Sequence, residues 1–203
     1  MSTDDKKVHD KVLLQKLRDI TGVGMMDCKK ALEETGNDLE KAIEFLRKKG
    51  AAVASKRAEK ETSEGIVHAY IHPGARLGVL IEINCETDFV ARTDDFKQFA
   101  QDVCLHIAAM KPLYLYPEDV DQKFLEHEKS ILRDQLAGSG KPEKIITQIL
   151  DGKVQKLYDE ICLVRQSFVK NDQITVADRL NELIAKTGEN IKIKRFVRYE
   201  LGE

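Results

Sequence analysis

The pattern that most constrains the fold of this chain is an apolar residue at every second position from Leu77 to Cys85. Successive side chains of a β-strand point to opposite faces of a sheet, so this segment predicts a strand with one apolar face. The alternating segment from Ile66 to His72 predicts a second strand, and the intervening residues 73–76, with sequence PGAR, suit a hairpin turn.

The last alternating segment, from Ile191 to Leu201, predicts a third, antiparallel strand. One face of this strand is predicted to be wet and to carry the polar residues Lys192, Lys194, Arg198 and Glu200. The apolar residues Ile191, Ile193, Val197, Tyr199 and Leu201 are expected together on the other face.

Helical periodicity dominates the residues between the second and third strands. The polar residues 93–95 suit the start of a helix. Its apolar stripe is Phe96, Phe99, Ala100, Val103, Cys104 and Ile107. Further helices are predicted from Pro117 to a stop at residues 138–140, across residues 141–163, and from Thr175 to Gly188. We therefore predict an α+β core, a small three-stranded antiparallel sheet packed with helices.

The N-terminal residues 9–49 predict three short helices. The second is expected from about Met25 to Thr35, and the pattern Asn37-x-x-Glu40 is a capping box that opens the third. A unit of this size has a small core, so its outer faces are free for contacts.

The composition changes near residue 50. The segment 51–64 is rich in alanine and charge and has no apolar stripe, which predicts a solvated linker or a loosely docked helix. We therefore divide the chain into a three-helix domain, 1–50, a linker, 51–64, and an α+β core domain, 65–203.

Charge and hydropathy exclude some classes of function. A net charge of -2 gives no overall positive field for nucleic acid, and no apolar run approaches the roughly 20 residues that span a bilayer. We expect a cytoplasmic protein without membrane or direct nucleic-acid contacts. The four cysteines stand far apart, without a C-x-x-C pair, which predicts reduced thiols rather than a zinc site or a disulfide framework.

The sequence offers no set of residues that would converge on a catalytic site. The histidines are scattered, and the carboxylates Glu86 and Asp88 have no assignable nucleophile or further acid beside them. The glycines of residues 22–24 connect two predicted helices and lack the Gly-Lys-Ser/Thr of a phosphate loop. We predict that the chain is not an enzyme and has no cofactor or metal of its own.

RNA binding by the C-terminal strand is one alternative. Lys194, Arg195 and Arg198 are interleaved there with aromatic residues, as on sheets that stack bases. Only Phe196 is predicted to stand among the cations, because Tyr199 belongs to the apolar face, and one ring is a poor stacking platform.

Apolar residues in exposed contexts point instead to a protein partner. Met25 and Met26 are neighbours on a helix, about 100° apart, so we expect one of them to face outward beside Lys29, although both could fill a small core. Phe89 follows an aspartate directly after a strand. Its ring must fold back, pack as a staple against the next helix, or insert into another molecule, and the residues alone leave these alternatives open.

Two long motifs resemble the elongation factor Ts family: TGVGMMDCKKALEETGNDLEKAIEFLRKKG at residues 21–50 and NCETDFVAR at residues 84–92. The C-terminal GENIKIKRFVRYELGE resembles the closing strand of that family's core. The resemblance implies that residues 1–50 form a three-helix domain of the ubiquitin-associated type.

The same resemblance implies a guanine-nucleotide exchange factor that binds elongation factor Tu and promotes GDP release, so that GTP can bind during translation elongation. It would act on the GDP and magnesium held by its partner. The positions that match partner-binding residues are Thr87, Asp88, Phe89, Val90, Arg18, Met25, Met26, Lys29 and His72. Asp88 and Phe89 would intrude near the partner's magnesium and phosphate site, and Thr87 and Val90 would shape the loop.

One departure concerns length. Many members carry two related core subdomains, whereas this chain has a single hairpin, from Ile66 to Cys85. A lone three-stranded sheet leaves edges and a face uncovered, so we predict a homodimer through the core. A ubiquitin-type helical adaptor is the other alternative, but an adaptor has no need of the segment Thr87–Val90.

Overall fold

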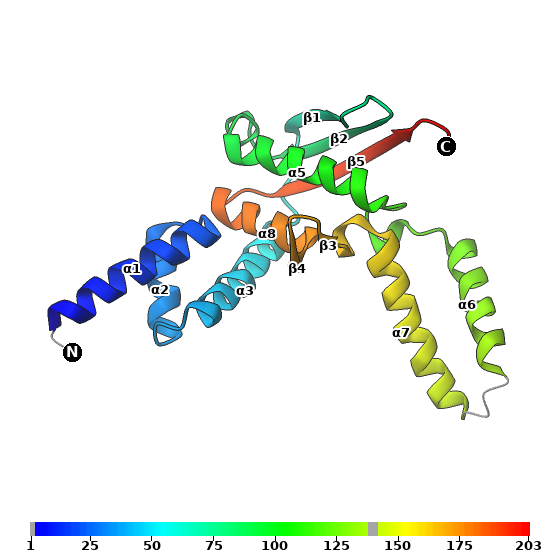
Figure 1. The fold of residues 1–203 in the computed structure, drawn as a ribbon, viewed down its shortest axis with the longest axis horizontal. Coiled ribbons are helices and arrows are strands. Elements are labelled where there is room, and N and C mark those ends of the chain that lie inside the picture. The colour runs from blue at the N-terminus through cyan, green and yellow to red at the C-terminus, as the bar shows by residue number, and fades with distance from the viewer. Residues whose placement is uncertain (1–2, 138–141) are drawn as a thin grey trace. The chain divides into compact units, whose positions relative to one another are not determined.

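The computed structural model describes residues 3–137 and 142–203, and Figure 1 shows the order of their elements. The α-helices are α1 Thr3–Thr21, α2 Met25–Glu34, α3 Leu39–Arg57, α4 Asp88–Ala91, α5 Asp94–Met110, α6 Gln122–Ala137, α7 Glu143–Ile161 and α8 Val176–Thr187. The strands are β1 Glu64–Ile71, β2 Leu77–Cys85, β3 Ser167–Phe168, β4 Asn171–Thr175 and β5 Ile191–Glu200, and the short 3-10 helices are η1 Pro117–Asp119 and η2 Leu163–Arg165.

Contacts within the chain form two compact units. The first unit comprises Met1–His68, Glu82–Ala100 and Asp178–Lys194. The second comprises Ala69–Ile81, Gln101–Ala177 and Arg195–Glu203. The predicted division at residues 51–64 therefore stays a prediction. Every helix within the described ranges is too short or too polar to span a lipid bilayer.

The main sheet has the strand order β1-β2-β5, with β2 in the centre. Every second residue of β2 is buried from Val79 to Cys85, as the alternation predicts. In the turn before β2, His72 N donates to Leu77 O at 2.9 Å and Ala75 N donates to His72 O at 2.9 Å. The predicted α+β class, with a small antiparallel sheet and helices, is confirmed.

Helix α5 buries the whole predicted stripe. Its six members, from Phe96 to Ile107, are fully buried. The hydroxyl of Thr93 accepts a hydrogen bond from Phe96 N at 3.3 Å and donates to Val90 O at 2.8 Å, so the predicted polar start caps the helix.

A buried histidine lies on the same helix, in the second unit. His106 Nδ1 accepts a hydrogen bond from Val169 N at 3.1 Å, and its Nε2 lies 2.9 Å from Gln166 Oε1. Because Nδ1 accepts, the proton of the neutral ring resides on Nε2 and is donated to Gln166. The ring stacks on Phe168 with centroids 6.0 Å apart, and burial lowers the pKa of His106.

The N-terminal helices α1, α2 and α3 share one small core. Its buried members are Leu17, Val23, Cys28, Ala31, Leu32, Ala42 and Leu46. The three predicted helices are present, but the predicted capping box at Asn37 is wrong. Asn37 has φ 63, and Asp38 is the N-cap, accepting from Lys41 N at 3.1 Å. Two successive left-handed residues, Gly36 and Asn37, delay the start of the helix by one position.

The third helix enters the segment that was predicted as a linker. Helix α3 continues to Arg57, so residues 51–57 are helical and only residues 58–63 lie between α3 and β1. Alanine, lysine and arginine are strong helix formers, and three alanines in residues 51–57 sustain the helix without an apolar stripe.

Two further predictions need correction. The predicted helix from Pro117 is interrupted, because η1 ends at Asp119, Val120 is extended, and α6 begins after Asp121, whose carboxylate accepts from Lys123 N at 2.7 Å. The predicted stop at residues 138–140 lies outside the described residues. The antiparallel pair β3–β4 was not predicted, because its strands are too short to alternate.

The predicted faces of β5 are wrong in its second half. Ile191 and Ile193 are buried, but Lys194 and Arg195 are both exposed, and the alternation then changes phase. Arg198 is consequently covered, with 8% of its side chain exposed, whereas Tyr199 is 73% exposed. In the second unit, the residues that were expected on the covered apolar face are therefore exposed, and Arg198, which was expected on the wet face, is covered.

Candidate functional site

The segment Thr87–Val90 forms the start of a short helix at the end of β2. Thr87 is the N-cap of α4, and its hydroxyl accepts from Val90 N at 3.4 Å. Within α4, Val90 and Ala91 are buried, whereas Phe89 is 75% exposed. The ring neither folds back nor packs as a staple in this structure, so two of the three alternatives for Phe89 are excluded.

The acid of the motif has a local partner. Asp88 Oδ2 lies 2.7 Å from Arg92 Nη2, one helical turn along the chain, and both side chains are largely exposed. Exposed ion pairs of this kind contribute about 0–1 kcal/mol, so this pair can open at little cost when another cation approaches.

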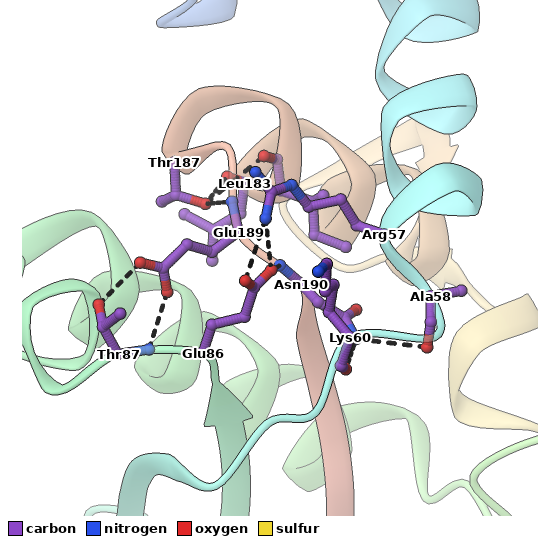
Figure 2. A network of polar contacts seen from close by, with 10 residues as sticks. Arg57, Ala58, Lys60, Glu86, Thr87, Leu183, Thr187, Glu189 and Asn190 are labelled. Atoms are coloured by element: carbon purple, nitrogen blue, oxygen red, sulfur yellow. Dashed lines mark hydrogen bonds and ion pairs between the residues drawn. The ribbon is translucent and has the colours of Figure 1, made fainter.

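A carboxylate from a distant segment holds the N-cap. Figure 2 shows Glu189 facing Thr87: Oε2 accepts from Thr87 N at 3.0 Å and Oε1 accepts from Thr87 Oγ1 at 2.7 Å. Glu189 directly follows Gly188, whose φ of +73° turns the chain out of α8. Both N–H and O–H of Thr87 are thus satisfied by one ionised group.

The residue before the N-cap, Glu86, is held by its own carboxylate. Both oxygens of Glu86 lie 3.0 Å from Arg57 Nη1 at the end of α3, and Glu86 Oε1 accepts from Asn190 N at 2.6 Å. The bond from Asn190 and then the guanidinium of Arg57 lower the pKa of Glu86. The amide of Asn190 donates to Ala58 O at 3.4 Å and to Lys60 O at 2.7 Å (Figure 2).

The thiol beneath this network is not reactive. Cys85 Sγ donates to Thr87 O at 3.1 Å, and burial, followed by the charge of Glu189, raises the pKa of Cys85 to about 11. Cys28, Cys104 and Cys162 are also buried free thiols. Within the described residues no group of His, Cys, Asp and Glu has the arrangement of a metal site.

The start of α2 presents the second predicted set of residues. Met25 is 53% exposed and Met26 is 75% exposed, so neither fills the core. Arg18, in the last turn of α1, is also exposed, and Lys29 is paired with Glu33 at 3.8 Å on the surface. All four side chains are accessible on the helical segment of the first unit.

The last predicted contact residue lies at the end of the β1–β2 hairpin. His72 is exposed, and its Nδ1 is 2.9 Å from the hydroxyl of Tyr70. It belongs to the second unit, and the other predicted residues belong to the first. Of the predicted contact residues, Thr87 to Val90 thus lie together at one short helix of the first unit, and His72 lies in the second unit.

The basic strand is less available to RNA than its sequence indicates. Arg198 is paired with Glu200 and Glu203, and Phe196 is half-buried. The alternating cations and rings therefore do not form one exposed platform.

The supporting residues Arg57, Glu189 and Asn190 were missed from the sequence. Thr87 and Glu189 are 102 positions apart, and no local period links them. The one usable signal is Gly188, a predicted helix end, because a residue just after a C-terminal turn has a fixed direction.

The fold and this site define a class of α+β proteins that carry an N-terminal three-helix segment and present an aromatic ring on a short helix held by polar bonds. A family model described as Elongation factor TS matches residues 5–203. The chain belongs to the elongation factor Ts family and is a factor of translation elongation.

Similar proteins carry the same name. An elongation factor Ts of Carboxydothermus hydrogenoformans is 56% identical over 191 residues, which cover 94% of this chain and 88% of that protein. That of Thermotoga petrophila is 55% identical over 191 residues, with 94% of this chain and 95% of the relative covered. That of Moorella thermoacetica is 57% identical over 187 residues, with 92% of each covered.

Proposed function

We propose that this chain is a guanine-nucleotide exchange factor for elongation factor Tu. It binds Tu with GDP in place and disturbs the magnesium and phosphate site with the segment Thr87–Val90, so that GDP leaves and GTP can bind. The chain breaks no covalent bond and needs no cofactor of its own, because it acts on the GDP and magnesium of its partner. We place this activity in the cytoplasm.

The mechanism is a thermodynamic coupling. If the factor binds empty Tu more tightly than GDP-bound Tu, then GDP must bind the factor-laden Tu more weakly by the same ratio. Each 1.4 kcal/mol of coupling changes the affinity about tenfold. Magnesium neutralises phosphate charge, so a ring that displaces the ion's surroundings leaves the diphosphate in a less favourable field.

The single observation that carries this proposal is the exposure of Phe89, 75%, on a helix whose next two residues, Val90 and Ala91, are buried. Burying a phenyl ring gains about 1.5–3 kcal/mol, and that gain is still available to a complex. Asp88 stands beside the ring in a weak surface pair, so it can exchange Arg92 for a partner group. Met25, Met26, Arg18 and Lys29 supply a second, adaptable contact on the helical segment.

The test is release of a fluorescent GDP analogue from purified Tu. Phe89→Ala should lower the factor-stimulated release rate at least about tenfold, while the free energy of unfolding changes by less than about 0.5 kcal/mol. Leu113→Ala is the matched control, because Leu113 is another exposed apolar residue, at 65%, outside the proposed site. Wild-type release by Phe89→Ala would contradict the proposal.

We propose further that two copies pair through the core sheet, as a single hairpin leaves that surface open. In the second unit an apolar hollow is lined by Ile71, Leu80, Val197, Tyr199 and Leu201 among others. Each of these five side chains is more than a third exposed. A second copy of the same surface would cover them in an isologous contact.

Light scattering at micromolar concentration checks this pairing. The wild-type chain should have the mass of a dimer and Ile71→Lys, which places a charge in the hollow, that of a monomer. Glu126→Ala, on the exposed surface of α6, is the control and should remain dimeric. A wild-type monomer at that concentration counts against the homodimer.

A further inference from the structure

The hydroxyl of Thr87 has two roles that depend on each other. It donates its one proton to Glu189 at 2.7 Å and accepts from Val90 N at 3.4 Å. A hydroxyl has one donor and two acceptor sites, so fixing the direction of the proton also fixes the direction of the lone pairs. Glu189 therefore selects the side-chain orientation of Thr87 in which α4 is capped.

The carboxylate also bonds the backbone where the chain leaves β2. Glu189 Oε2 accepts from Thr87 N at 3.0 Å, so the carboxylate grips both backbone and side chain of one residue. Bonds to an ionised acceptor are roughly twice as strong as neutral ones. This double contact sets the direction in which α4 starts, and Phe89 lies in its first turn.

Glu189 is itself held on a rigid base. Its backbone N donates to Thr187 Oγ1 at 3.4 Å, and Thr187 Oγ1 donates to Leu183 O at 2.9 Å (Figure 2). Leu183 and Ile184, in the last turns of α8, are buried. The carboxylate thus links Thr87, at the start of α4, to the packed helix α8.

We propose that Glu189 is a positioning residue for nucleotide exchange: its bidentate contact with Thr87 holds α4 so that the ring of Phe89 is presented in one orientation. This role rests on the proposed exchange function. Glu189 does not touch the nucleotide in this scheme, and acts only through Thr87 and α4. Without the contact, the ring samples more orientations, and binding must first select the competent one, which lowers the apparent rate of exchange.

The variants separate the two bonds. Glu189→Ala removes both acceptors, Glu189→Gln keeps one oxygen, and Thr87→Val removes the hydroxyl while keeping its shape. Thr87→Ser keeps the hydroxyl, and the backbone N–H of residue 87 is present in both variants. Glu126→Ala, which removes an exposed carboxylate paired with Lys129 on α6, is the matched control.

The first measurement is the rate of GDP release from Tu at a factor concentration well below saturation, where the rate depends on the apparent affinity of the factor. Glu189→Ala and Thr87→Val should slow release about tenfold and Glu189→Gln less. Thr87→Ser, which keeps the hydroxyl, should slow release less than Thr87→Val, and Glu126→Ala should keep the wild-type rate. The double variant Glu189→Ala with Phe89→Ala should be no slower than Phe89→Ala alone, because a positioning residue has no effect once the ring is gone. Additive losses, or wild-type release by Glu189→Ala beside a slow Phe89→Ala, would overturn the proposal.

The second measurement needs no partner. Amide hydrogen exchange in the free chain should be faster at Thr87 and Val90 in Glu189→Ala, while the amides of α5 keep their protection. Unchanged protection at Val90 overturns the positioning role even if the exchange function holds. If wild-type chain fails to accelerate GDP release at all, the exchange function is refuted and the role of Glu189 in it falls too, whatever the amides show.

Discussion

Phe89 and Phe96 lie seven positions apart on consecutive helices, yet 75% of one residue and none of the other is exposed. Phe96 is held by the core around α5, where every member of the stripe is buried. The helix that carries Phe89 is anchored by the buried Val90 and Ala91 and by the polar bonds of Thr87 and Glu86. Burial fixes a side chain only where an interior exists, and a ring that must stay accessible has to be fixed through its backbone.

The two modes differ in free energy. Burial of Phe96 contributes to folding, whereas the apolar surface of Phe89 contributes nothing until another molecule covers it. Polar bonds at Thr87, the N-cap of α4, supply order without covering the ring. The comparison predicts that substitutions near α5 change stability first and substitutions near α4 change exchange first.

The largest effect is expected for Phe96→Ala. It should lower the free energy of unfolding by about 3–5 kcal/mol, because a fully buried ring leaves a cavity. Urea denaturation followed by circular dichroism measures this loss, and Phe89→Ala is the control, expected within about 0.5 kcal/mol of wild type. Equal losses for the two variants would show that burial holds both rings.

The next largest effect is expected from acid, which should weaken the fold around α5 at a higher pH than it weakens the network at α4. Because burial lowers the pKa of His106 below its usual 6.5, the unfolded chain binds more protons just below pH 6.5 than the folded chain does. Stability should therefore fall as the pH drops below about 6.5, by at most about 1.4 kcal/mol per pH unit. Urea midpoints between pH 7.5 and 5.5 give the slope, and His106→Gln should flatten it.

The network behind α4 should respond only at lower pH. The pKa of Glu86 is lowered from its usual 4.5, so its contribution is present above that value and is lost as the pH falls through the folded pKa. Helix α4 should therefore keep its amide protection at pH 5.5, where His106 already weakens the fold. Equal loss of protection in α4 and α5 at pH 5.5 would contradict this separation.

The smallest effect on stability is expected at Thr93, between α4 and α5. Thr93→Ala should cost about 1 kcal/mol, because it removes the cap of α5 and the bond to Val90 O. Urea denaturation measures the loss, and Thr93→Ser should restore most of it. A neutral Thr93→Ala would mean that the packed stripe alone fixes the start of α5.

Local patterns predicted most of the fold. The strands, the hairpin turn and the stripe of α5 follow from periods of two and 3.6 residues, which depend only on neighbours in sequence. The start of α3 was misplaced by one residue because Asn37 and Asp38 are both good caps, and only the left-handed φ of Asn37 distinguishes them. The second half of β5 was assigned the wrong faces because two adjacent exposed residues shift its phase.

The site was predicted less completely than the fold. Sequence identified Phe89 as an exceptional residue but left its direction open, because that direction depends on Glu189, 102 positions beyond Thr87. The two methionines were expected to differ in exposure, and both are exposed because the small core of α1, α2 and α3 is filled by other residues. Contacts between remote segments carry no local signal.

The bonds of Asn190 to Ala58 O and Lys60 O fix the length of the chain from Arg57 to Lys60, in the first half of the segment 58–63 that joins α3 to β1. A segment that joins two elements usually tolerates insertions, but one extra residue between Arg57 and Lys60 would shift a carbonyl by about 3.3–3.6 Å and break its contact. The same shift would move Arg57 relative to Glu86. Chimeric chains that exchange the N-terminal helices should therefore keep the number of residues from Arg57 to Lys60 unchanged.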